Sequence, residues 1–176
     1  MALSDKVATI FGGTGFIGRH IVRELAKNHI TVRVATRTPE KAYFLRPFGV
    51  VGQIVPEYCN IYDDEDLRRL ITGSDYVINC IGILSEKGGA TFERMHKQVP
   101  ERIASICAAQ DVTRFVHLSA LGADNNPSRY ARTKKAGEDA ALQHFSRATI
   151  LRPSVVFGPG DGFFNMFARM SCFLPA

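Results

Sequence analysis

A glycine-rich turn between an apolar strand and an amphipathic helix most constrains what this chain can fold into. Apolar and β-branched residues fill positions 7–11, and glycines follow at regular intervals of three. Such glycines permit a tight turn, let the backbone approach a pyrophosphate and let the helix pack closely on the strand. The first N–H groups of the helix would bind the anion; a turn that serves packing alone is the alternative. The residues expected to contact a dinucleotide here are Gly12, Thr14, Gly15, Phe16, Ile17 and Gly18.

The rest of the chain alternates β-branched runs with amphipathic segments. The helical period is clear over 15–27, and a second helix is predicted over 91–110, which Pro100 should kink or split. Strands that are apolar throughout indicate a parallel sheet covered on both faces, with right-handed crossovers. We therefore predict one Rossmann-type domain over 1–176, with a doubly wound parallel α/β sheet of about six strands and its switch point between the first and fourth. The strands are predicted at 7–11, 31–35, 52–55, 76–80, 114–118 and 148–151.

The composition is that of a soluble globular domain, with 45% hydrophobic and 22% charged residues. No apolar run reaches the roughly 20 residues that span a bilayer, and the first strand begins almost at once. We therefore expect neither a leader peptide nor direct membrane insertion. No CxxC pair is present, so free thiols in a reducing compartment are expected at Cys59, Cys80, Cys107 and Cys172.

The net charge of +5 comes from scattered Lys and Arg residues that suit solvated helix faces. This pattern favours an anionic small ligand over a nucleic acid. The acidic run Asp63 to Asp66 has no His or Cys at ligand spacing, so it is interpreted as the start of a helix, and no metal site is predicted.

The end of the second predicted strand carries Arg37 where an NAD site usually has an acidic residue. A guanidinium there can pair with a 2′-phosphate, and Thr38 before Pro39 is typical of a helix N-cap that would add a second anion-binding terminus. NADP(H) is therefore favoured and NAD(H) remains open, since Arg37 could be an ordinary solvated residue. Arg19 is a second candidate for phosphate contact, or an ordinary exposed helix position.

Tyr130 and Lys134 lie four residues apart, which places them on one face of a helix. A phenol exchanges protons poorly at neutral pH unless a nearby ammonium stabilises its anion. Lys134 could do so, and could also hold the nicotinamide ribose.

With these motifs the chain resembles the extended or atypical short-chain dehydrogenase/reductases, of the NAD-dependent epimerase/dehydratase type. The resemblance implies adenine contacts at Asn60 and Ile61, and a ribose- and pyrophosphate-lining segment at Cys80, Ile81 and Gly82. It also implies a nicotinamide loop at Pro153, Ser154 and Val155, and a catalytic set of Ser119, Tyr130 and Lys134.

Longer segments at 79–84, 128–134 and 157–165 are similar to a group within this family, the NADPH-binding accessory subunits of respiratory complex I and their bacterial relatives. That resemblance implies a structural or regulatory subunit in contact with other complex I subunits. It would lie in the bacterial cytoplasm, at the inner membrane face, or on the matrix side of a mitochondrion. An active NAD(P)-dependent reductase, epimerase or dehydratase using Tyr130 and Lys134, and a redox sensor, are the alternatives.

Two departures from the family pattern weaken the enzyme hypothesis. Ser119 lies early, and if the usual serine position is occupied by Leu121, the substrate oxygen loses a donor. His96 stands where many relatives place an Asn, and it is expected to serve packing or a helix hydrogen bond. His117 is expected to be an ordinary core or surface residue rather than a base for Ser119. The chain ends at Ala176, before the segment that builds the substrate lid in extended members, so we expect the lid part to be missing.

Overall fold

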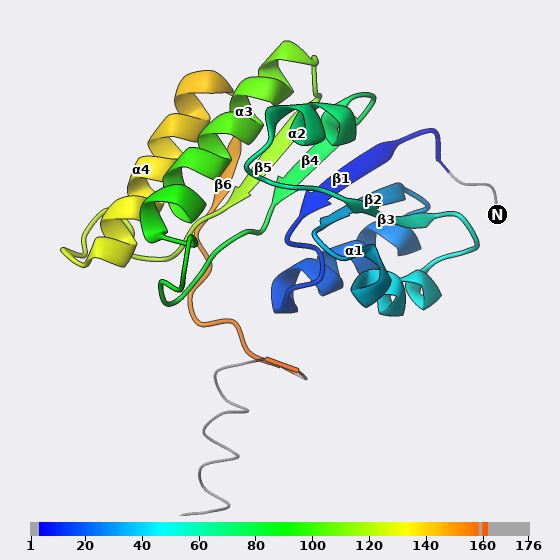
Figure 1. The fold of residues 1–176 in the computed structure, drawn as a ribbon, viewed down its shortest axis with the longest axis horizontal. Coiled ribbons are helices and arrows are strands. Elements are labelled where there is room, and N and C mark those ends of the chain that lie inside the picture. Colours follow the sequence, from blue (N-terminus) through cyan, green and yellow to red (C-terminus); the bar gives the residue numbers. More distant parts are fainter. Residues whose placement is uncertain (1–3, 159, 162–176) are drawn as a thin grey trace, which may run out of the picture.

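The computed structural model describes residues 4–158 and 160–161, which form a parallel sheet with helices on both faces (Figure 1). The strand order is β3-β2-β1-β4-β5-β6, so the direction of winding reverses between β1 and β4. This confirms the predicted doubly wound sheet and its switch point. The strands are β1 (Val7–Phe11), β2 (Thr31–Thr36), β3 (Ile54–Tyr58), β4 (Tyr76–Asn79), β5 (Arg114–Leu118) and β6 (Thr149–Leu151).

The helices cover the two faces of the sheet unequally. One face carries α1 and a 3₁₀ segment, η1; the other carries α2, a π-helical segment, η2, and the pair α3 and α4. None of the helices in the described part of the chain has the length and hydropathy that a membrane crossing requires. Their bounds are α1 (Phe16–Lys27), η1 (Pro39–Phe48), α2 (Asp64–Ile71), η2 (Glu93–Gln98), α3 (Val99–Ala109) and α4 (Arg129–His144).

Each face of the sheet has its own apolar core, because side chains alternate along a strand. On β1, Ala8 and Ile10 belong to the cluster beneath α1, whereas Phe11 belongs to the cluster beneath α2, α3 and α4. Thr9 faces the second cluster, where its hydroxyl donates to the Leu70 carbonyl at 2.9 Å. β1 is thus buried on both faces, which explains its continuous apolar character.

The third strand begins two residues later than predicted, and the expected span 52–55 is wrong at both ends. The reason is the buried side chain of Gln53. Its amide donates to the carbonyls of Ala26 and Ile30 at 2.7 and 3.0 Å, and its oxygen accepts from Val50 N–H at 3.0 Å. These bonds hold 50–53 as a turn, and the strand starts after it. Pro56 is accommodated because β3 is an edge strand.

The predicted helix over 91–110 is split just before Pro100. A split was expected because proline has no N–H to donate. The π-helical η2 ends at Gln98 and regular α-helix resumes at Val99. Pro100 cannot donate to the His96 carbonyl one turn earlier. That carbonyl lies against Gly137 of α4, where an added Cβ would be only 1.8 Å from the oxygen. The missing side chain therefore allows α4 to approach η2 closely.

Gly137→Ala should lower the free energy of unfolding by about 2 kcal/mol, because the new methyl group forces α4 away from the His96 carbonyl. In an open helix the same change would stabilise by about 1 kcal/mol. Chemical denaturation of Gly137→Ala beside Ala136→Gly, a control on the same helix expected to lose about 1 kcal/mol, measures this. A gain in stability for Gly137→Ala would show that the close approach is not tight.

Candidate functional site

A cavity of about 740 Å³ opens at the carboxyl ends of β1, β4 and β5, where the direction of winding reverses. Ligands of doubly wound sheets bind in such a crevice. The segment after β6 leaves the sheet as an extended chain and passes along the opening (Figure 1). The predicted site residues that line the cavity are Gly12, Gly15, Phe16, Ile17, Gly18, Cys80, Gly82, Ser119, Tyr130, Lys134, Pro153, Ser154 and Val155.

The glycine turn is shaped to accept an anion. Gly12 has φ +79°, a conformation that side chains disfavour, and Gly15 N–H donates back to the Gly12 carbonyl at 3.0 Å. A Cβ on Gly18 would lie 2.2 Å from the same carbonyl, so only glycine lets α1 start this close to β1. No side chain caps the helix and no acidic residue lies in its first turn. The first N–H groups of α1 are therefore available to a pyrophosphate.

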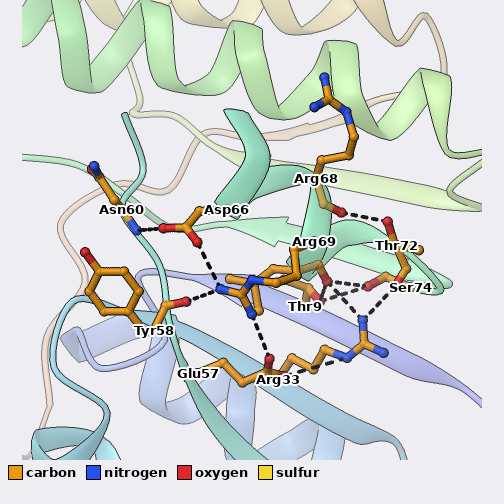
Figure 2. A network of polar contacts seen from close by, with 11 residues as sticks. Thr9, Arg33, Glu57, Tyr58, Asn60, Asp66, Arg68, Arg69, Thr72 and Ser74 are labelled. Carbon is orange, nitrogen blue, oxygen red and sulfur yellow. Dashed lines mark hydrogen bonds and ion pairs between the residues drawn. The ribbon is translucent and has the colours of Figure 1, made fainter. Parts of the chain in front are cut away.

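The predicted adenine end is held by a polar network between α2 and the strands (Figure 2). Asn60 N–H donates to the Asp66 carboxylate at 2.8 Å, while Asn60 Oδ1 accepts from Tyr62 N–H at 3.1 Å. Arg69 donates to the Tyr58 carbonyl at 2.6 Å and to Asp66 at 3.1 Å. The Asn60 N–H bond and Arg69 lower the pKa of Asp66. Neither Asn60 nor Ile61 lines the cavity; the network fixes the loop that carries them.

The acidic run begins α2 rather than forming a ligand cluster. Asp63 is the N-cap, and its carboxylate accepts from Glu65 N–H at 2.8 Å. Asp64 pairs with Arg102 at 2.7 Å. Across the described residues no group of three or more His, Cys, Asp or Glu side chains is arranged to hold a metal ion.

The predicted phosphate-binding cations lie outside the cavity lining. Arg37 is exposed at the end of β2 and has no hydrogen bond or ion pair with the described residues. Arg19 Nε donates to the Gly15 carbonyl at 3.3 Å, one turn back on α1. Thr38 is the N-cap residue of η1, as predicted, and its main-chain carbonyl accepts from Lys41 N–H at 3.1 Å. Its hydroxyl makes no cap hydrogen bond.

Tyr130 and Lys134 lie on α4, whose start is capped by Ser128 accepting from Ala131 N–H at 3.2 Å. Lys134 is 4% exposed, and its ammonium donates to the Leu118 carbonyl at 3.0 Å. Burial lowers its pKa to about 8. Burial also raises the pKa of Tyr130. The expected lowering of the phenol pKa by Lys134 is therefore absent in this arrangement.

Ser119 lies in the same cavity lining as Tyr130, although its early position in the sequence suggested otherwise. Its side chain is buried, and its hydroxyl has no hydrogen-bond partner among the described residues. Leu121, the alternative position, is 69% exposed and also lines the cavity. The Ser119 hydroxyl oxygen is itself buried, so the residue lines the cavity without exposing this oxygen to it.

His96 links the loop after β4 to the helix that carries Tyr130. Ile83 N–H donates to His96 Nε2 at 3.1 Å, and His96 Nδ1 lies 3.2 Å from the Thr133 hydroxyl. Its ring stacks on Phe92 and meets the edge of Tyr130. Burial and the charge of Lys134 lower its pKa to about 4, so it is neutral at physiological pH. The expectation of a packing and hydrogen-bonding role agrees with these contacts.

His117 lies in the core, one of the two positions expected for it. Its Nδ1 is 3.2 Å from Asn79 Nδ2, and Asn79 Oδ1 accepts from Ile81 N–H at 3.0 Å. Burial lowers the pKa of His117 to about 3. The Asn79 side chain thus links His117 to the loop after β4, while Ile81 itself packs against the core and does not line this cavity.

Several apolar residues of the lining were not predicted as site residues, and neither Thr14 nor Ile81 reaches it. Their positions directly after predicted strands could have identified them, because the ends of parallel strands meet at one edge of the sheet. Their apolar character instead suggested core positions. These residues are Ile83, Leu84, Leu118, Ala120, Leu121 and Val156.

Lys134 predicts a pH-dependent stability. Its pKa is lowered from 10.5 to about 8 in the folded state, so between these values the unfolded chain binds more protons and stability rises with pH. Relative to Lys134→Met, the free energy of unfolding should rise by up to about 3 kcal/mol from pH 8 to 10.5.

Denaturant titrations of both proteins across this range measure the difference. The thiols of Cys59 and Cys107, whose pKa values burial raises, act in the opposite direction but cancel between the two proteins. Parallel stability curves would contradict a buried ammonium.

Comparison with known proteins gives a consistent family match. Residues 8–172 match the model of the NAD dependent epimerase/dehydratase family. The chain is 35% identical over 167 residues to NADH dehydrogenase [ubiquinone] 1 alpha subcomplex subunit 9, mitochondrial, of Dictyostelium discoideum, covering 94% of this chain and 46% of that protein. It is 34% identical over 168 residues to ceramide reductase of Caulobacter vibrioides, covering 93% and 51%. The chain thus spans about half the length of these relatives.

The fold also matches solved structures at low identity. The UDP-glucuronic acid 4-epimerase of Bacillus cereus, in complex with NAD, superimposes with a TM-score of 0.75 at 20% identity, covering 96% of this chain and 63% of the other. This likeness concerns the fold alone.

Proposed function

This chain belongs to the NAD dependent epimerase/dehydratase family, and we propose that within it the chain is an NADP(H)-binding accessory subunit of respiratory complex I. The relative from Dictyostelium discoideum supports the complex I assignment. It is named as a subunit of NADH dehydrogenase [ubiquinone], and its match covers 94% of this chain. By this proposal the bound nucleotide stabilises a subunit that docks on its neighbours at the matrix or cytoplasmic face of the membrane.

The proposal rests on a difference between the half of the cavity at the glycine turn and the half at Tyr130. The nucleotide half is formed: a glycine turn with free N–H groups faces the loop at Cys80 and Gly82. The proton-transfer half is not activated, because burial raises the pKa of Tyr130 and the Lys134 ammonium donates to Leu118. Binding is therefore better supported than turnover.

The residues present fit a dinucleotide. Gly18 lets α1 start directly against the Gly12 carbonyl, and the N–H groups of α1 would hold the pyrophosphate. Lys134 keeps further N–H donors beyond its bond to Leu118, and these would hold the ribose hydroxyls. The loop at Pro153 to Val155 would flank the nicotinamide. When bound, NADPH would supply a hydride.

NADP(H) rather than NAD(H) is proposed because of the end of β2. Arg37 is exposed there without a protein partner in the described chain, and no acidic side chain is present in 35–39 to accept from a ribose 2′-hydroxyl. A guanidinium in this state can bind a 2′-phosphate without breaking an existing ion pair.

An active reductase is the second candidate, and the Ser119 hydroxyl favours it. Ser119 and Tyr130 line one cavity, and neither hydroxyl has a hydrogen-bond partner among the described residues. The Caulobacter vibrioides relative is named a ceramide reductase, which makes reduction of a carbonyl the reaction to test.

Arg37→Glu should weaken NADPH binding tenfold or more and leave NADH binding nearly unchanged, because a charge-assisted contact to the 2′-phosphate contributes about 1.5–3 kcal/mol. Fluorescence titration of both nucleotides measures this. Arg147→Glu makes the same charge change beyond the end of α4 and should alter neither affinity. An equal loss for NADPH and NADH would refute a 2′-phosphate contact.

Tyr130→Phe separates the two candidate functions. An accessory subunit should retain NADPH affinity within about twofold, whereas an enzyme should lose turnover by about 10² to 10⁴-fold. Mass spectrometry of the copurified nucleotide, followed by an assay of NADPH oxidation with candidate carbonyl compounds, gives the readout. Substrate-dependent oxidation that Tyr130→Phe abolishes would rule out a purely structural role.

A further inference from the structure

The turn between η1 and β3 presents two adjacent aliphatic side chains to solvent. Val51 is fully exposed and Val50 is 60% exposed. The buried side chain of Gln53 fixes this turn, because its oxygen accepts from Val50 N–H and its amide donates to the carbonyls of Ala26 and Ile30. Adjacent aliphatic groups that a fixed turn holds in water indicate a contact surface.

The outer side of η1 extends this surface with aromatic side chains. A 3₁₀ helix repeats every three residues, so one row of its side chains, which includes Leu45, is buried while Tyr43 and Phe44 are exposed. Arg46 joins these rings to the turn. Its guanidinium lies 3.8 Å from the centre of the Tyr43 ring, and its carbonyl accepts from Gly49 N–H at 3.2 Å. We call this surface the η1 ridge; it consists of Tyr43, Phe44, Val50 and Val51.

Free cations accompany the η1 ridge. The segment 37–52 carries three cations, Arg37, Lys41 and Arg46, against one acidic residue, Glu40, and all four are exposed. None of the three cations forms an ion pair within the described part of the chain. η1 packs beside α1 and β3 at one edge of the sheet (Figure 1). This edge therefore combines exposed apolar groups with positive charge that no carboxylate of the described residues neutralises.

A second group of exposed apolar side chains differs from the η1 ridge in its charges. Leu84 and Leu121 lie at the cavity. The two arginines next in sequence to residues of the cavity lining are Arg129 and Arg152, and each is paired with a carboxylate, at 2.8 and 2.6 Å. Exposed apolar groups and free cations thus coincide at the η1 ridge and not at the cavity.

An anionic membrane surface has the chemistry that this combination matches. Lys and Arg side chains are attracted to anionic headgroups, aromatic rings favour the level of the headgroups, and aliphatic groups enter the boundary with the acyl chains. A nucleic acid would attract the same cations. The exposed valines, however, offer its bases neither a hydrogen bond nor an aromatic ring for stacking. The η1 ridge therefore fits a lipid surface better than a nucleic acid.

We propose that the η1 ridge docks this domain on an anionic membrane surface, with Val50 and Val51 at the acyl boundary and Lys41 and Arg46 among the headgroups. The turn lies at the amino end of β3, whereas the cavity opens at the carboxyl ends of the parallel strands. The docked domain therefore keeps its cavity directed away from the lipid. This docking is independent of the proposed nucleotide and of the proposed complex I partners.

Co-sedimentation of the full chain with phospholipid vesicles measures the docking. At low salt, vesicles of phosphatidylcholine with about 30% phosphatidylglycerol should bind the protein at least about tenfold more tightly than vesicles of phosphatidylcholine alone. Raising the NaCl concentration to about 0.5 M should weaken this binding, because salt screens the headgroup charge. Equal binding to the two kinds of vesicle, or no binding to the anionic vesicles at low salt, would overturn the proposal.

Two double variants test the η1 ridge itself. Val50→Ser with Val51→Ser should weaken binding to the anionic vesicles about tenfold, since serine loses the apolar surface that enters the acyl boundary. Lys41→Ser with Arg46→Ser should weaken it about fivefold per charge removed. All four side chains are exposed, so both variants should fold, and thermal unfolding checks this. Wild-type affinity in the valine variant would show that charge alone holds the protein and would reject the η1 ridge.

Matched control variants remove the same kinds of side chain elsewhere. Arg68→Ser with Arg147→Ser removes two exposed cations, one on α2 and one after α4, from the face of the sheet opposite η1. Leu84→Ser with Leu121→Ser removes exposed apolar groups at the carboxyl ends of the strands. Neither control should change vesicle affinity by more than about twofold. Losses as large as those of the η1 ridge variants would reduce the binding to net charge or general apolarity and overturn the proposal.

A competition experiment separates lipid from nucleic acid. A DNA duplex of about 20 base pairs, added at the same low salt, should leave most of the protein on the anionic vesicles. If the duplex instead removes the protein, and the valine variant binds the duplex as tightly as the wild type does, the free cations serve a nucleic acid and the lipid assignment is wrong.

Discussion

The contact between the start of α1 and the end of β1 is the constraint on which the rest of the structure depends. A Cβ on Gly18 would overlap the Gly12 carbonyl, so the helix reaches this position only with glycine there. β1 lies at the centre of the sheet, between β2 and β4, and both apolar cores include its side chains. The same close approach leaves the first N–H groups of α1 facing the crevice. Packing and anion binding therefore have one cause.

A second close approach fixes the other side of the cavity. Pro100 leaves the His96 carbonyl without its usual helical donor, and Gly137 lets α4 pack directly against that carbonyl. The His96 ring then bridges the loop after β4 to Thr133 of α4. Tyr130 and Lys134 are carried on the helix so placed. Because burial keeps His96 neutral, this bridge does not change charge in the physiological range.

Local patterns predicted the sheet well and the tertiary details poorly. The run at β1 is apolar because both of its faces are covered, so the sequence carries the signal directly. The start of β3 depends on Gln53 bonding to carbonyls more than twenty residues away, which no local pattern reveals. The pKa of Tyr130 likewise depends on its burial in the folded protein, which no local pattern reveals. The apolar lining residues were not predicted, because only the topology distinguishes a Leu at a strand end from a core Leu.

Lys134 bears on both halves of the cavity, the one that would hold the nucleotide and the one that contains Tyr130. Even with its pKa lowered to about 8, the side chain is mostly protonated at neutral pH, and its ammonium is held by a backbone carbonyl. That bond orients the remaining N–H donors without supplying a negative charge that would compete with a ligand. An ammonium fixed in this way suits a neutral ribose hydroxyl, which needs geometry more than charge. Activation of the phenol would require the ammonium to offset the burial of Tyr130, and in this arrangement burial prevails. The cavity thus offers N–H donors from α1 and Lys134, while the one effect on the pKa of Tyr130 is burial, which raises it.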